Sequence, residues 1–190
     1  GLKKRNIRAS FFLIGENIEG NEDILLQMRK DGHLIGNHTW DHVQLDKIPA
    51  EKARLEIEKT NNRIYEASGI YPSYVRPPFG AWIKETDDAL VKACGQASTV
   101  CRAPYGAITD EQMSAVGKPF FMWSTDSLDW KLMDADADYN QIMNDSSLGD
   151  GSIILMHDGY QTSVDAALKI ADLFTEKGYV FVTADQLLLT

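Results

Sequence analysis

Short apolar runs alternate with amphipathic segments along this chain, which is the pattern of an α/β protein. Residues 9–15 form an apolar run that stops at a glycine and predict a buried strand, whereas residues 21–30 carry apolar side chains on one helical face. Residues 33–38 predict a second strand, and residues 49–67 predict a long charged helix. The second unit of strand and helix therefore repeats the first. The inward-facing residues of the long helix are predicted to be Leu55, Ile57 and Ile64.

The rest of the chain continues this pattern with shorter strands. The predicted strands are each followed by a polar loop and lie at residues 74–76, 98–102, 119–124 and 152–156. A helix at about 163–177 and an apolar run at 179–182 follow. Such repetition indicates a parallel barrel or an open parallel sheet, and in both architectures catalytic groups collect at the C-terminal ends of the strands. No linker or low-complexity segment interrupts the pattern, so we expect one domain over residues 1–190.

Composition and charge narrow the classes of partner. The 190 residues are 44% hydrophobic and 25% charged, which is typical of a globular domain and excludes a disordered chain. A formal charge of −9 repels nucleic-acid phosphates, so we expect no nucleic-acid partner. No stretch approaches the roughly 20 apolar residues of a membrane-spanning helix. Cys94 and Cys101 fit either one local disulfide or two reduced thiols.

The segment from His38 to His42 is the strongest candidate for a metal site. Its two histidines are four positions apart at the end of a predicted strand, a spacing that places both imidazoles on one face of a helical turn. Neutral imidazole is a ligand for Zn, Co, Ni or Fe. Two hydrogen-bonded histidines without a metal are the alternative interpretation of this spacing.

Two further strand ends carry residues suited to acid and base chemistry. His157 follows the apolar run at 152–156 and is a candidate general acid, whose ring a nearby carboxylate would orient. Asp126 follows the apolar run at 119–124. The alternatives are a helix-capping Asp126 and a core histidine. Arg76 precedes two prolines, and its guanidinium is suited to bracing a buried carboxylate, unless this segment is an ordinary turn.

Taken in order, four segments resemble motifs of the polysaccharide deacetylase family, the NodB-homology domain of carbohydrate esterase family 4. They are the metal-binding motif at 38–42, the groove motif at 76–80, the Asp-x-x-Asp-Trp motif at 126–130 and the Leu-x-His motif at 155–157. The resemblance implies a distorted, incomplete parallel β/α barrel of the TIM type. It also implies one divalent metal ion, zinc before cobalt, nickel or iron. The reaction implied is hydrolysis of acetyl groups from chitin-like glycan, peptidoglycan or acetylated xylan by a secreted or cell-wall-associated protein.

The same resemblance assigns roles to individual residues. His38 and His42 are the expected metal ligands, His157 the general acid, Asp126 the residue that tunes His157, and Arg76 the groove arginine. The expected substrate-binding residues are Pro78, Phe79, Tyr105, Trp130 and Leu155.

One departure from the family pattern concerns its first motif, Thr-Phe-Asp-Asp-Gly, which does not occur in these 190 residues. In the family, that motif carries the expected base and the third metal ligand. We expect the family's first strand to be missing together with the motif. The pair Asp87-Asp88 is interpreted as the solvated start of a helix. The sequence therefore leaves three hypotheses: an enzyme, an inactive glycan-binding or scaffold module, and a domain whose first strand comes from a separate N-terminal segment.

A second departure is a repeated groove motif. Residues 102–106 repeat the pattern of residues 76–80, so Arg102 rivals Arg76, which we favour. The segment between them, with both cysteines, is interpreted as an insertion or local duplication. Asp134, Asp136 and Asp138 resemble a calcium loop, but Tyr139 stands where the turn requires glycine, which predicts a solvated acidic run.

Overall fold

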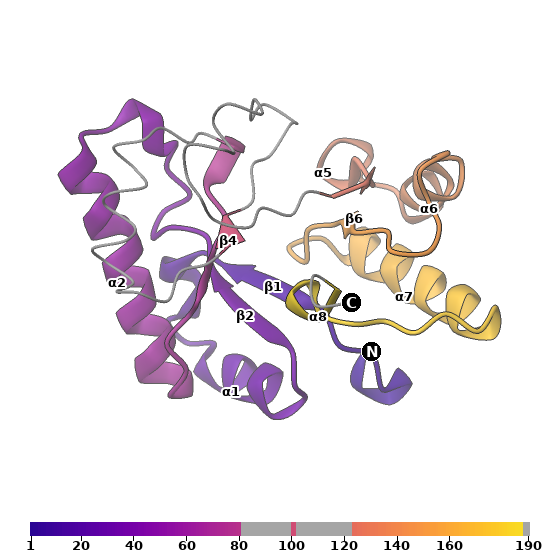
Figure 1. Cartoon of the computed structure of the whole chain (residues 1–190), viewed down its shortest axis with the longest axis horizontal. Coiled ribbons are helices and arrows are strands. Elements are labelled where there is room, and N and C mark those ends of the chain that lie inside the picture. Colours follow the sequence, from indigo (N-terminus) through magenta and orange to yellow (C-terminus); the bar gives the residue numbers. More distant parts are fainter. Residues whose placement is uncertain (81–99, 102–122, 188–190) are drawn as a thin grey trace. The chain divides into compact units, whose positions relative to one another are not determined.

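The structure, a computed structural model, describes residues 1–80, 100–101 and 123–187 (Figure 1). These residues belong to two compact units. The sheet unit comprises residues 10–122, and the terminal unit combines residues 1–9 with residues 123–190. The predicted roles of Arg102 and Tyr105, and the helix start at Asp87-Asp88, lie outside the described residues.

The sheet unit is built on a parallel sheet with strand order β1-β2-β3-β4. Its elements are β1 (Ser10–Leu13), η2 (Gly15–Ile18), α1 (Glu22–Lys30), β2 (Leu34–Asn37), η3 (Leu45–Lys47), α2 (Ala50–Ser68), β3 (Tyr74–Val75), η4 (Pro78–Gly80) and β4 (Val100–Cys101). Leu13 pairs with Asn37, and Asn37 pairs with Val75. The register therefore brings the residues that follow β2 and β3, His38 and Arg76, to the same edge of the sheet.

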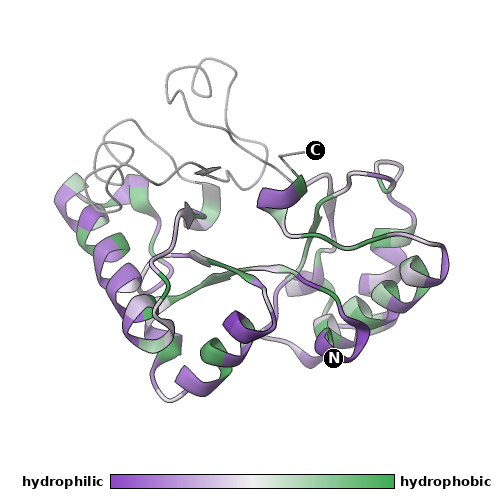
Figure 2. Ribbon diagram, turned by 60° about the horizontal axis from the view of Figure 1, so that its bottom comes forward, coloured by the Kyte–Doolittle hydropathy of each residue, from purple (hydrophilic) through white to green (hydrophobic). Residues whose placement is uncertain are grey.

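Helices α1 and α2 pack against each other and against β2 (Figure 1). Ile57 and Ile64 are completely buried, as predicted, but Leu55 is 48% exposed and the prediction for it is wrong. Two residues span about 200° of a helix, so Leu55 lies on the side opposite Ile57. Figure 2 shows the resulting mixture of hydrophilic and hydrophobic positions along the helices. The helix ends at Gly69, whose φ of 71° suits glycine.

The terminal unit joins a parallel strand pair to a layer of helices. Its elements are η1 (Lys3–Arg5), β5 (Thr125–Asp126), α5 (Asp129–Leu132), α6 (Ala135–Met143), β6 (Ile154–Leu155), α7 (Gln161–Glu176) and α8 (Ala184–Leu187). Helix α6 packs against α7, with Ile142, Ile170 and Phe174 in the core between them. Most of the strand expected at 119–124 lies outside the described residues, and the described chain after it forms β5 at Thr125–Asp126. At the other end of the sequence, Arg5 in η1 forms a two-pronged ion pair with Asp172 of α7 at 2.6 Å.

The acidic run at 134–138 is only partly solvated. Asp134 caps α6 by accepting a hydrogen bond from the Ala137 amide at 2.8 Å, and the exposed Asp136 pairs with Lys169. Asp138 is completely buried, and within the part of the chain that the structure describes neither of its carboxyl oxygens has a hydrogen-bond partner. The prediction of a solvated run is therefore wrong at Asp138, because the helix turns this residue to the same face as Ile142. Burial, with the charges of Asp129 and Asp134, raises the pKa of Asp138.

An α/β fold with parallel strands is thus confirmed, while the incomplete barrel stays a prediction. Among the described helices, none combines the length and apolar character needed to cross a membrane.

Candidate functional site

His38 directly follows β2, and one of its ring nitrogens is held by the backbone. Its Nδ1 atom is hydrogen-bonded to the carbonyl oxygen of Arg76, the residue that follows the neighbouring strand. A carbonyl oxygen only accepts hydrogen bonds, so Nδ1 must carry the proton and Nε2 the lone pair. A metal-binding histidine is commonly fixed in this way through its other nitrogen. His38 is 6% exposed, so a packed surrounding holds the ring.

His42 lies beside His38 because the intervening residues form a loop rather than a helix. The two imidazole ring centroids are 4.8 Å apart, with the rings at 73°. Thr39 and His42 adopt left-handed φ values of 68° and 62°. Each such conformation costs a non-glycine residue about 1–3 kcal/mol and persists only where surrounding contacts enforce it. The loop therefore brings two imidazoles together, although not by the helical turn that the spacing suggests.

The segment after β3 supplies further predicted residues next to these histidines. Phe79 has a left-handed φ of 57°, is 48% exposed, and its ring centroid lies 5.0 Å from that of His42. Pro78 is buried beside it. The sheet unit thus brings His38, His42, Phe79 and the backbone of Arg76 together.

The donor set of this group fits a divalent metal ion. Two imidazoles in contact, one of them with its tautomer fixed by a carbonyl, match the ligand chemistry of zinc and its neighbours. Within the residues that the structure describes, no third histidine, cysteine or carboxylate completes a ligand group. The remaining coordination positions therefore require ligands other than these two histidines.

The terminal unit carries the candidate acid. His157 donates its backbone N–H to Oδ2 of Asp129 at 2.6 Å, and its Nδ1 atom lies 2.7 Å from Oδ1 of the same carboxylate. Asp129 is completely buried and also accepts a hydrogen bond from the Trp130 amide at 2.9 Å. Burial by itself raises the pKa of Asp129, but the hydrogen bonds from the His157 ring and amide outweigh it and lower that pKa. The carboxylate thus holds the ring of His157 through Nδ1, and Nε2 is the other ring nitrogen.

The carboxylate that contacts His157 is therefore Asp129, whereas the family resemblance predicts Asp126 as the residue that tunes His157. Asp126 pairs with Leu155 in the strand register, and its carboxylate accepts a hydrogen bond from the Leu128 amide at 3.0 Å. His157 lies two residues beyond Leu155, so its partner comes from the turn beyond Asp126. The second aspartate of the Asp-x-x-Asp-Trp segment was the signal that sequence reasoning passed over.

The other predicted substrate-binding residues of the terminal unit differ in exposure. Trp130 is 45% exposed on α5, whereas Leu155 is buried in β6 at 6%. Trp130 therefore presents a large aromatic surface directly after Asp129, a property typical of sugar-binding sites.

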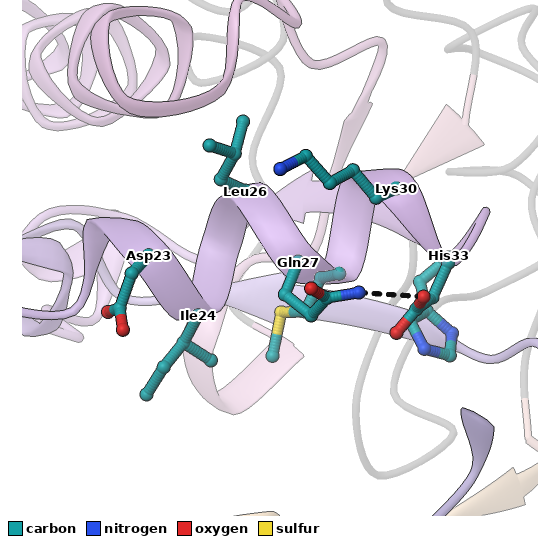
Figure 3. Close-up of a pocket in the computed structure, with 8 residues that line it drawn as sticks. Asp23, Ile24, Leu26, Gln27, Lys30 and His33 are labelled. Carbon is teal, nitrogen blue, oxygen red and sulfur yellow. Dashed lines mark hydrogen bonds between the residues drawn. The ribbon is translucent and has the colours of Figure 1, made fainter. Parts of the chain in front are cut away.

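A shallow depression along α1 lies away from these residues. It is lined by side chains of α1 together with His33, and Gln27 donates a hydrogen bond to Asp31 across it at 2.8 Å (Figure 3). His33 precedes β2 and His38 follows it, so the depression belongs to the opposite end of the strand. The His33 ring packs edge-to-face on Phe11 with centroids 5.1 Å apart.

Comparison with known proteins agrees with these motifs. A family profile described as polysaccharide deacetylase matches residues 1–87. The chain is 33% identical over 186 residues to the peptidoglycan-N-acetylmuramic acid deacetylase PdaC of Bacillus subtilis, covering 98% of this chain and 34% of that protein. It is 34% identical to a peptidoglycan-N-acetylglucosamine deacetylase of Bacillus cereus, covering 100% of this chain and 61% of that protein.

Solved structures agree as well. The structure of PdaC superposes with a TM-score of 0.75 at 33% identity, covering 98% of this chain and 78% of that one. A CE4 family pseudoenzyme from Bacillus anthracis gives a TM-score of 0.74 at 24% identity, which shows the fold alone.

Parallel α/β proteins carry their binding and catalytic residues at the C-terminal ends of the strands, and this chain belongs to that class. Within that class, the chain belongs to the polysaccharide deacetylase family, carbohydrate esterase family 4. It spans about one third of the length of the first curated relatives that it matches.

Proposed function

We propose that this chain is the catalytic domain of a metal-dependent deacetylase that removes acetyl groups from an N-acetylated cell-wall glycan. The observation that carries this proposal is the pair formed by His157 and the buried Asp129. A carboxylate costs free energy to bury, and a domain that only binds glycan has no use for one that orients a histidine. The names of the relatives, which are peptidoglycan and chitin deacetylases, support the substrate class.

His38 and His42 would hold the metal ion, with zinc the first choice and cobalt, nickel or iron the alternatives. The bound ion supplies two kinds of chemistry: it polarises the acetyl carbonyl and lowers the pKa of a bound water. The backbone carbonyl of Arg76 contributes by keeping the lone pair of His38 on Nε2. The Phe79 ring contacts the His42 ring, with their centroids 5.0 Å apart, and would restrict the approach of water from that side.

His157 would deliver a proton from Nε2 to the leaving amine, and Asp129 holds the ring for this step through Nδ1. A backbone amide near Phe79 would stabilise the oxyanion, and Trp130 would form one wall of the acetyl pocket. The roles predicted for Asp126, which is to tune His157, and for Tyr105, which is to bind substrate, remain to be tested. Arg76 is the groove arginine and braces the carboxylate that acts as base.

That base belongs to the first family motif, which these 190 residues do not contain. We propose that a separate N-terminal segment supplies it, together with the first strand and the third metal ligand. The same observation favours a second candidate, an inactive module that binds glycan. Action on a cell-wall polymer requires a location outside the cytoplasm, so we infer that the protein is secreted or associated with the cell wall.

Acetate release tests the proposal and separates the two candidates. The chain alone and an extended protein that carries the Thr-Phe-Asp-Asp-Gly motif are incubated with Zn²⁺ and N-acetylated peptidoglycan, chito-oligosaccharide or acetylated xylan. We expect acetate from the extended protein and little from the chain alone, because a missing general base costs about 10²–10⁴ in rate. The His157→Ala variant of the extended protein is the control. Glycan binding without acetate release by the extended protein would establish the inactive module instead.

A further inference from the structure

The loop that carries the two imidazoles has backbone amides in its middle that need partners. Trp40 and Asp41 lie between Thr39 and His42, the two residues with left-handed φ values. A loop bent at both ends cannot satisfy these amides through helical hydrogen bonds. Trp40 is half-buried and Asp41 is exposed, so the cost of an amide without a partner falls mainly on Trp40, for which the surrounding structure supplies an acceptor.

Helix α2 supplies this acceptor through the side chain of Glu56. Its Oε2 atom accepts a hydrogen bond from the Trp40 amide at 2.9 Å and another from the Asp41 amide at 3.3 Å. Hydrogen bonds to an ionised carboxylate are stronger than those to a neutral acceptor. One carboxylate oxygen therefore joins the centre of the loop to a long, rigid helix.

Neighbouring contacts hold the Trp40 side chain to the same helix. The Lys59 ammonium lies 3.5 Å from the centre of the Trp40 ring, one helical turn after Glu56. A Cβ atom at Gly15 would lie 2.6 Å from a Trp40 ring carbon and 2.7 Å from the Thr60 hydroxyl. Only glycine fits at position 15, and the indole has little room to move.

Asn37 ties the first end of the loop to α2 in a second way. Its side-chain amide donates to the Ile57 carbonyl at 2.9 Å and to the Asn61 side chain at 2.7 Å. Its Oδ1 atom accepts a hydrogen bond from the Thr39 amide at 2.8 Å. Asn37 thus fixes the first turn of the loop. Glu56 accepts from the amides nearer to His42, where the Trp40 carbonyl also accepts a hydrogen bond from the Glu16 amide at 3.0 Å.

We propose that Glu56 is the positioning residue of the metal loop: it holds the Trp40 and Asp41 amides so that His38 and His42 keep the separation and orientation needed to share one ion. The part of this inference that concerns the ion rests on the proposed function. The part that concerns the loop rests on the hydrogen bonds alone. Outer residues that orient metal ligands typically contribute 10–100-fold to metal affinity.

The test compares Glu56→Ala, Glu56→Gln and Glu58→Ala in the full chain. Glu58 is the matched control, because it lies on the same helix but pairs with Arg54 instead of the loop. Hydrogen exchange at the Trp40 and Asp41 amides is followed by NMR without metal, and Zn²⁺ affinity is measured by competition with a chelating dye. We expect Glu56→Ala to accelerate exchange at these two amides and to weaken Zn²⁺ binding by about 10–100-fold. Glu58→Ala should change neither.

Glu56→Gln keeps an oxygen acceptor and should restore amide protection and Zn²⁺ affinity to within roughly threefold of the unmodified chain, since a neutral acceptor loses only part of the hydrogen-bond strength. If Glu56→Ala lowers the melting temperature of the whole domain, the glutamine variant decides: equal loss in both variants overturns the positioning role. Unchanged exchange and unchanged affinity in Glu56→Ala also overturn it. If the unmodified chain binds no Zn²⁺, the proposed metal centre fails, while the exchange measurement still decides whether Glu56 holds the loop.

Discussion

His38 in the sheet unit and His157 in the terminal unit are held through the same ring atom by different acceptors. The Nδ1 atom of His38 meets a backbone carbonyl, whereas that of His157 meets the buried carboxylate of Asp129. Each acceptor fixes the ring orientation and directs Nε2 away from the protein partner. The chemistry proposed for each ring therefore depends on whether its acceptor is neutral, like the Arg76 carbonyl, or charged, like the Asp129 carboxylate.

A neutral carbonyl suits a metal ligand, because the imidazole remains neutral and offers its lone pair. A carboxylate suits a group that carries a proton, because it stabilises the positive ring that forms when Nε2 is protonated. Regular elements position both acceptors: Arg76 directly follows β3 in the sheet unit, and Asp129 is the first residue of α5 in the terminal unit. The proposed metal ligand His38 and the proposed acid His157 therefore differ in the acceptor that strand register or a helix start places beside them, and not in the histidine itself.

The largest expected effect is the loss of metal from the sheet unit. We expect the double variant His38→Ala and His42→Ala to retain no stoichiometric Zn²⁺ after dialysis, because the two imidazoles that contact each other are both removed. Metal content by atomic absorption is the measurement, with His157→Ala as the control that keeps its ion. Equal metal content in the double variant and the unmodified chain would eliminate this site.

The second-largest expected effect is on the rate of acetate release, when the charged acceptor of His157 is replaced by a neutral one like that of His38. Asp129→Asn replaces the carboxylate by a neutral amide of nearly the same shape. We expect the rate of acetate release by the extended protein to fall by about 10²–10⁴, the range for impaired acid catalysis, with little change in Zn²⁺ content. Asp126→Asn is the matched control in the same segment. A greater loss in Asp126→Asn than in Asp129→Asn would restore the assignment made from the sequence.

A smaller effect separates Arg76 from its rival Arg102. The carbonyl that holds His38 belongs to the backbone, so Arg76→Ala should leave Zn²⁺ binding intact. Its rate at saturating substrate should fall by roughly 10-fold or more, about 1.4 kcal/mol, and Arg76→Lys should recover only part of it. Arg102→Ala should act mainly on stability or substrate affinity. Steady-state kinetics with thermal melts decide, and a rate loss confined to Arg102→Ala would exchange the two assignments.

The smallest expected effect is on the free energy of unfolding, and it has opposite signs at the two buried carboxyl groups of Asp129 and Asp138. The pKa of Asp129 is lowered in the folded state, so its stabilising contribution is present above about pH 4 and is lost as the pH falls through the folded value. The pKa of Asp138 is raised, so stability is lost as the pH rises above about 4 toward the folded value. At pH 7 we expect Asp129→Asn to lower stability by about 1–3 kcal/mol and Asp138→Asn to raise it slightly.

Urea unfolding between pH 3 and pH 7 measures both effects. The difference between each variant and the unmodified chain should shrink at the acid end of this range. A stabilising effect of Asp129→Asn at pH 7, or a destabilising effect of Asp138→Asn that does not depend on pH, would contradict the opposite signs.

Local patterns were sufficient for most of the fold. The apolar runs predicted β1 and β2, and helical periodicity predicted α1, α2 and α7, with Leu55 placed on the wrong face of α2. The positions that failed depend on where a helix begins. Asp138 becomes buried because α6 begins after Asp134, a start that one-dimensional spacing does not specify.

The candidate site was predictable in its residue types but not in its contacts. Ordered motifs indicated His157 and the two histidines proposed as metal ligands, whereas the partner of His157 follows from the register of Asp126 against Leu155. Glu56 gave no signal in the sequence, because a glutamate on a charged helix resembles any solvated residue. Its hydrogen bonds to the loop exist only after α2 packs against β2.

The ion pair between Arg5 and Asp172 has a consequence for the order in which the domain folds. It joins residues that are 167 positions apart, with the whole sheet unit inserted between them. During synthesis the sheet unit emerges complete while the terminal unit still lacks α7, and closing so long a loop is slow and entropically costly. Helix α2, which anchors the metal loop through Glu56, therefore lies in the part of the chain that is synthesised first, and the pair of His157 and Asp129 lies in the part that is synthesised last.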